Sequence, residues 1–212
     1  MSDPLAVLQR IRDAPTRSER GSRESDDLER CELCREPIPA DHGHMVDLEV
    51  RNLMCACRGC YLLFTPEGAG GGHYRAVPGR WVRLAPELIG RDILDSLQIP
   101  VGIAFVFYNS KLSRAVAVYP SPAGPTESEL PLPDWGDLVG SDNGMPTIEA
   151  DVEALLARTD HRAGKSRFYI APIDACYELV GRLRTLWRGF DGGPDAQKAI
   201  DEFFERAESR GR

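Results

Sequence analysis

Two Cys-x-x-Cys pairs constrain this chain more than any other feature of its sequence. Cys31 and Cys34 form the first pair, Cys57 and Cys60 form the second, and twenty-two residues separate the two pairs. Each pair places two sulfurs on one side of a tight turn, and two such turns together offer four thiolates at the tetrahedral geometry that zinc prefers. A structural ion would also explain how a segment with few apolar residues folds, because zinc contributes about 10–16 kcal/mol in small finger peptides. We predict that these four cysteines bind a metal ion.

The alternative use of paired cysteines is in disulfide bonds. The first residues, MSDPLAVLQRIRDAP, lack a basic stretch followed by an apolar run, so we expect a cytoplasmic protein, and the reducing cytosol disfavours disulfides. Four thiolates bind zinc or iron. Zinc, our expectation, would be structural, whereas iron, the alternative, would carry single electrons. We expect Cys55 to be a small buried residue; its other interpretation is that it replaces one of the four ligands.

Charge and composition restrict the classes of partner and of function that we expect. The chain has 26 Lys and Arg against 33 Asp and Glu, a net charge of −7, which disfavours nucleic acid as a partner. No apolar run approaches the ~20 residues of a membrane span. We find no Ser-His-Asp or paired-carboxylate arrangement and name no catalytic residue, which favours a non-enzymatic protein that binds another protein. His42 and His44 are expected to be loop histidines, and His73 could support the metal ligands from outside the coordination shell.

The order of the predicted elements indicates an α+β fold in three parts. Residues 1–27 read as a short helix and a charged, flexible linker. Residues 28–84 form the four-cysteine module, in which 65–80 is a Gly-rich loop without helix or strand. Residues 85–208 form an antiparallel sheet packed with helices, in which 101–109 and 114–119 pair as a hairpin. The remaining strands are expected at 81–84, 129–132 and 167–171, and the helices at 86–97, 147–156, 172–190 and 194–207.

The cysteine module resembles two known metal-binding arrangements. The two Cys-x-x-Cys pairs are similar to the knuckles of rubredoxin, except that Arg35 and Tyr61 stand where glycine is usual, and this resemblance implies an iron that carries electrons. The pairs together with His42-Gly-His44 and Asn52-Leu53 resemble the treble-clef module of HNH nucleases, in which a histidine activates water beside a catalytic metal. Tyr61 also departs from that pattern, which has histidine or asparagine after the last knuckle, so the resemblance implies at most a degenerate nuclease. A zinc ribbon or treble clef with structural zinc is the simpler expectation.

Four segments carry a wider resemblance that covers about residues 28–206. They are CELCREPIPADHGHMVDLE, NLMCACRGCYLLF, GGGHYRAVP and PIDACYELVGRLRTLWRGFDGG. In combination they resemble a family of uncharacterised proteins encoded with high-affinity NiFe uptake hydrogenases. The resemblance implies an accessory factor for hydrogenase maturation, assembly or electron transfer, and a hydrogenase subunit or maturation factor as its protein partner.

Overall fold

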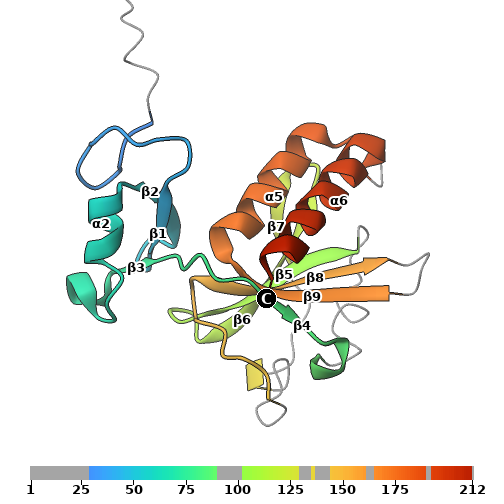
Figure 1. Cartoon of the computed structure of the whole chain (residues 1–212), viewed down its shortest axis with the longest axis horizontal. Helices are drawn as coiled ribbons and strands as arrows, with labels where there is room; N and C mark the ends of the chain where they lie inside the picture. The colour runs from blue at the N-terminus through green and yellow to red at the C-terminus, as the bar shows by residue number, and fades with distance from the viewer. Residues whose placement is uncertain are drawn as a thin grey trace, which may run out of the picture.

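A six-stranded antiparallel sheet with two helices on one face forms the larger part of the protein (Figure 1). The computed structural model describes residues 29–89, 102–128, 135–136, 144–160, 165–189 and 192–211. In spatial order the strands of the sheet are β4 (Val82–Leu84), β9 (Lys165–Pro172), β8 (Glu153–Asp160), β5 (Ile103–Asn109), β6 (Arg114–Ser121) and β7 (Gly124–Glu127). The helices are α5 (Ile173–Leu186) and α6 (Gly193–Arg210). We call this part the sheet domain.

Alternating side chains of the central strands divide the core of the sheet domain into two apolar clusters. Ile103, Phe105 and Phe107 of β5 point to the face that α5 and α6 cover. Ala104 and Val106, between them in sequence, point to the opposite face. Successive side chains of a strand lie on opposite faces, so a strand buried on both sides reads as a continuous apolar run. The predicted hairpin is confirmed by the pairing of β5 with β6, from Phe105 opposite Val118 to Asn109 opposite Arg114.

A second, smaller sheet carries the cysteines. Its strands are ordered β2 (Asn52–Ala56), β1 (Gly43–Asp47) and β3 (Tyr74–Ala76), and the short helix α2 (Arg58–Leu63) follows β2 directly. The turn between β1 and β2 is fixed by Asp47, whose carboxylate accepts hydrogen bonds from the backbone N–H groups of Glu49 and Val50. We call residues 29–76 the cysteine module. Figure 1 shows it beside the sheet domain, joined to β4 by one extended segment.

The helix predicted at 147–156 is wrong. Residues 147–149 have no regular structure, and residues from Glu153 onward form β8 in the middle of the large sheet. Leu155 packs in one apolar cluster and Leu156 in the other, so the segment is buried on both faces. An apolar run of this kind satisfies a helical pattern as well as a strand pattern, and only its neighbours decide between them.

The loop predicted at 65–80 also contains regular structure. β3 pairs with β1, and a 3₁₀ helix, η1 (Ala69–Gly72), precedes it. The predicted helix at 86–97 begins as the 3₁₀ helix η2 (Pro86–Leu88), and its part beyond residue 89 lies outside the described residues. The strand predicted at 129–132 and the N-terminal helix and linker at 1–27 also lie outside them. Strands 81–84 and 167–171 and the last two helices are confirmed as β4, β9, α5 and α6, and the coarse fold class α+β is confirmed with them.

Candidate metal centre

The four predicted ligands come from two local structures that face each other. Cys31 and Cys34 lie on a tight turn closed by backbone hydrogen bonds from Cys31 to Glu36 and from Arg35 to Cys31. Arg35 adopts a positive φ of 67°, the backbone conformation for which rubredoxin-like knuckles use glycine. Cys57 caps α2, and the N–H of Cys60 donates to its sulfur at 3.4 Å. The turn and the first turn of the helix thus hold two sulfurs each.

The structure brings the four sulfurs of Cys31, Cys34, Cys57 and Cys60 to within 4.8 Å of one another. Sγ of Cys34 lies 3.6 Å from Sγ of Cys57. Sulfurs bonded at 2.3 Å to one tetrahedral ion are about 3.8 Å apart, whereas a disulfide would bring them to about 2 Å. All six cysteines of the chain are free thiols in the structure. The four-cysteine cluster is therefore compatible with one metal ion, and the disulfide alternative is not adopted.

The pKa values of Cys31 and Cys60 are shifted in opposite directions. Burial acts to raise the pKa of Cys31, but hydrogen bonds with the backbone of Cys57, Cys34 and Leu33 outweigh it and lower the pKa to about 6. Burial, followed by contacts with the other three thiols, raises the pKa of Cys60 to about 12. One thiolate thus opposes the formation of the next, because like charges at this distance repel. A cation at the centre of the cluster would remove that opposition and let all four sulfurs ionise.

Cys55 belongs to a second group of potential metal ligands. One ligand atom each of Cys55, His42 and His44 lies within 4.8 Å of the others. Cys55 is half-buried, and its thiol donates to a carboxylate oxygen of Glu29 at 3.4 Å. This environment differs from the buried apolar position that we expected for Cys55. It also differs from the alternative, because Cys55 groups with the histidines and the four-cysteine cluster is complete without it.

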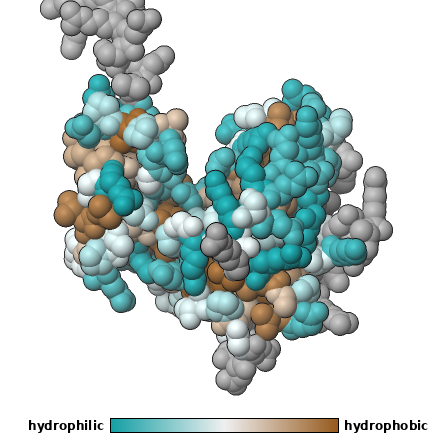
Figure 2. All heavy atoms as spheres, in the orientation of Figure 1, coloured by the Kyte–Doolittle hydropathy of each residue, from teal (hydrophilic) through white to brown (hydrophobic). Residues whose placement is uncertain are grey.

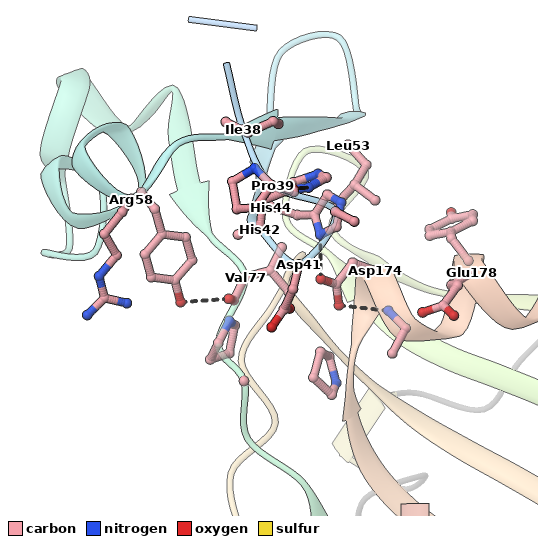
Figure 3. A pocket seen from close by; sticks show the side chains of 18 of the residues that line it. Ile38, Pro39, Asp41, His42, His44, Leu53, Arg58, Val77, Asp174 and Glu178 are labelled. Atoms are coloured by element: carbon pink, nitrogen blue, oxygen red, sulfur yellow. Dashed lines mark hydrogen bonds and ion pairs between the residues drawn. The ribbon is translucent and has the colours of Figure 1, made fainter. Parts of the chain in front are cut away.

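A groove of about 1450 Å³ runs between the cysteine module and α5. His42 and His44 line it from the module, and Asp174 and Glu178 line it from α5 (Figure 3). Figure 2 shows the same region as a hollow between the two parts of the molecule. Cys57 also lines this groove, so residues from both groups of potential ligands border one open space.

Polar contacts join the cysteine module, and the segment that follows it, to the sheet domain. Nδ1 of His44 lies 2.8 Å from a carboxylate oxygen of Asp174, in the first turn of α5. That hydrogen bond is the main cause that raises the pKa of His44 above its ordinary value. Arg75 donates to the backbone oxygen of Ala150 at 2.7 Å, and Arg80 pairs with the fully buried Glu153 at 2.6 Å. The position of His44 is thus set by a residue 130 positions away in the sequence.

Gly43, between the two histidines, has a packing role that its sequence position does not reveal. A Cβ at this position would lie 2.6 Å from the ring of Tyr61. The hydroxyl of Tyr61 donates to the backbone oxygen of Val77 at 2.8 Å, so the ring is fixed at both ends. Tyr61 therefore fastens α2 to β1, at the position where the HNH pattern has histidine or asparagine.

The other residues singled out in the sequence lie outside both groups of ligands. His73 is exposed, and its Nε2 is 3.7 Å from Glu49, so it does not support the metal ligands as we had considered. Cys176, the remaining cysteine, is completely buried in the core of the sheet domain, and this burial raises the pKa of its thiol. Two residues of the site were not foreseen at all: Asp174, which fixes His44, and Glu29, which contacts Cys55.

The chain matches a known family model over residues 30–211, which is nearly all of its length. The description of that model is "Family of unknown function (DUF5947)". The chain belongs to this family. No curated protein and no solved structure matches it. The family match agrees with the resemblance to an uncharacterised family, and it carries no assignment of activity.

In the described part of the chain, no helix combines the length and the apolar character that a bilayer span requires. The longest, α6, has 18 residues, and its charged residues include Asp201, Glu202 and Glu205.

Proposed function

We propose that the protein is a metal-binding accessory factor that acts through protein–protein contacts and carries a structural zinc ion at Cys31, Cys34, Cys57 and Cys60. The observation that supports this proposal best is the convergence of the four sulfurs within 4.8 Å from two separate local structures. A closed shell of four protein thiolates leaves no coordination position for a substrate, and such shells are typical of structural zinc.

The order of elements around the cluster supports a treble-clef arrangement. A knuckle with two cysteines is followed by the β1–β2 hairpin and then by a helix whose first turn supplies the other two cysteines. The ion would join the knuckle to the helix across the hairpin. The predicted boundaries of the module, 28–84, and of the following domain, 85–208, belong to this proposal, although β4 (Val82–Leu84) pairs with β9 in the large sheet.

An exposed apolar surface on α2 supports a protein partner. Leu62 and Leu63 are 51% and 69% exposed on this helix, which contributes no buried residue. Figure 2 shows brown side chains at the outer edge of the module, where α2 lies in Figure 1. Adjacent exposed leucines form an apolar patch of the kind that marks a protein–protein interaction site. The partner that we propose, a NiFe-hydrogenase subunit or maturation factor, rests on the sequence resemblance alone.

Metal analysis with a visible spectrum of the purified full chain tests the nature of the ion. We expect about one zinc per four-cysteine cluster, no absorption in the visible range, and loss of that zinc in the Cys34→Ser variant. Stoichiometric iron with a red colour would instead establish the rubredoxin-like alternative, in which the cluster carries electrons for a hydrogenase. A preparation with neither metal, even after reconstitution with each, would refute the metal-binding proposal.

Co-purification with defined hydrogenase proteins tests the partner. The double variant Leu62→Lys/Leu63→Lys should lose binding to a purified NiFe-hydrogenase subunit or maturation factor while it keeps its metal. Leu112→Lys is the matched control, because Leu112 is an exposed leucine of the sheet domain. Equal binding by all three proteins would contradict the proposed surface, and no binding by the wild type would contradict the proposed partner.

A further inference from the structure

The β1–β2 hairpin places three soft or borderline metal ligands on one of its faces. His44 lies directly opposite Cys55 in the register of the two strands. Directly opposed residues of an antiparallel pair point to the same face. His42 lies just before β1, and the centroids of the His42 and His44 rings are 4.8 Å apart. The proximity of His44 and Cys55 is therefore a consequence of strand geometry, and His42 joins them through its ring contact with His44.

The orientation of both imidazoles leaves a nitrogen of each available as a ligand. Nδ1 of His42 lies 2.9 Å from the backbone oxygen of Pro39, which can only accept, so this nitrogen carries the proton. Nδ1 of His44 donates in the same way to Asp174 (Figure 3). In each ring the proton on Nδ1 leaves the lone pair on Nε2. Metal-binding histidines are oriented by this kind of contact with a carbonyl or a carboxylate.

One buried ring nitrogen of His42 has no hydrogen-bond partner among the described residues. The side chain of His42 is only 7% exposed. Its Nε2 is buried and has no hydrogen-bond partner among the described residues. A buried polar atom without a partner costs free energy, about 1–3 kcal/mol, so native proteins rarely keep one unless something binds there. Cys55 supplies the sulfur that a cation at this point would need, and the carboxylate of Glu29 adds negative charge beside it.

From these observations we propose a second metal site, formed by His42, His44 and Cys55, that binds one transition-metal ion of the zinc and cobalt class. Two imidazoles and one thiolate suit such ions better than magnesium or calcium, which prefer oxygen. Three protein ligands leave the fourth position of a tetrahedral ion for water or another small ligand, as in catalytic zinc sites. His42 and His44 both line the groove between the module and α5, so that ligand would arrive from the groove.

Asp174 has a specific role in this second site. It accepts from His44, and its other oxygen accepts from the N–H of Ala175 at 2.7 Å, so it is itself held in place by the start of α5. The sheet domain would therefore set the orientation of one metal ligand in the cysteine module. Removal of such a carboxylate typically weakens metal binding by about 10–100-fold.

Metal counting on the full chain tests the proposal. We expect two zinc ions per wild-type chain, and one ion per chain in His42→Gln and in Cys55→Ala. His73→Gln is the matched control, because His73 lies outside both groups, and it should keep two ions. Cys34→Ser should lose the other ion, so failure of the four-cysteine site and failure of this second site are distinguishable. A wild-type chain with one ion that His42→Gln and Cys55→Ala both retain would overturn the proposal.

Cobalt titration provides a second measurement that does not depend on the purified metal content. Co²⁺ bound by one thiolate and two imidazoles absorbs differently from Co²⁺ bound by four thiolates, so the two sites should give two distinguishable spectra in the wild type. Asp174→Asn should weaken the mixed site by about 10–100-fold and leave the four-thiolate spectrum unchanged. A circular dichroism spectrum equal to that of the wild type shows that each variant is folded. Folded variants whose titrations equal that of the wild type would overturn the proposal.

Discussion

The cysteine module and the sheet domain reach a folded state by different means. The sheet domain buries two apolar clusters, one on each face of a six-stranded sheet. The module has few buried apolar side chains within residues 29–76, which are Cys31, Ile38, Met45, Leu48 and Ala56. One of these is itself a predicted metal ligand. So small a core is rarely sufficient for an independent fold. The comparison teaches that the module depends on its ion and on its neighbour, whereas the sheet domain depends on packing.

Removal of a metal ligand should cause the largest loss of stability, and this loss should be confined to the cysteine module. Cys31→Ser takes away the most buried of the four sulfurs, and structural zinc contributes about 10–16 kcal/mol in small domains. We expect amide hydrogen exchange in β1 and β2 to rise to the rate of an unfolded chain, while β5 and β8 keep their protection. Cys176→Ala, which removes a thiol outside both metal groups, is the control and should keep module protection. Loss of protection in both regions at once would show that the two parts fold as one unit.

Truncation in the core of the sheet domain should have the opposite distribution of effects. Phe204 is fully buried between α6 and the sheet, where its ring contacts Tyr169. Phe204→Ala should lower the free energy of unfolding of the sheet domain by about 3–5 kcal/mol. Metal content, measured on the folded protein, should stay at the wild-type value, because Phe204 lies on α6 in the sheet domain whereas all the potential metal ligands lie in the module. A variant that loses its metal in proportion to its stability would contradict the division of the molecule into two differently stabilised regions.

The same division explains how much could be predicted from the sequence. The two Cys-x-x-Cys pairs identify the four-cysteine cluster because ligand chemistry requires a fixed local spacing. The strands at 103–109 and 114–121 were also predictable, because their runs are rich in β-branched and aromatic residues. The two C-terminal helices were predictable because their apolar residues repeat with the helical period. β8 was mistaken for a helix because Leu155 and Leu156 are both buried, and period alone cannot separate a doubly buried strand from a helix.

The second group of ligands was not predictable in the same way. His42 and His44 were expected to be loop histidines, whereas His44 lies in β1, and the register of β1 against β2 places it opposite Cys55. The contact between Asp174 and His44 is even harder to predict, since 130 positions separate the two residues in the sequence. β3 was read as loop because its strand of three residues follows a run of glycines and has no periodic pattern. Contacts between the cysteine module and the sheet domain depend on the assembled fold, so no local pattern of residues predicts them.

The smallest expected loss of stability concerns the segment that joins the cysteine module to the sheet domain. Arg80 donates two hydrogen bonds to the buried carboxylate of Glu153, at 2.7 and 2.6 Å, and one to the backbone oxygen of Thr147. Arg80→Ala would leave a buried charge without its partner, which costs about 3 kcal/mol. We expect a lower denaturation midpoint together with faster amide exchange at the junction, because Arg80 ties the segment that follows the module to the start of β8.

Arg83 supplies the matched control, since it lies three residues further along the chain and also pairs with a glutamate. Its partner Glu208 is 42% exposed, whereas Glu153 is fully buried. Arg83→Ala should therefore cost less than about 1 kcal/mol, because water screens an exposed pair. Equal denaturation midpoints for Arg80→Ala and Arg83→Ala would mean that the buried carboxylate of Glu153 does not need Arg80 as its partner. The junction would then depend on the apolar contacts of Val46 and Leu53 with the large cluster, to which Val77 belongs. Packing rather than this ion pair would hold the module against the sheet domain.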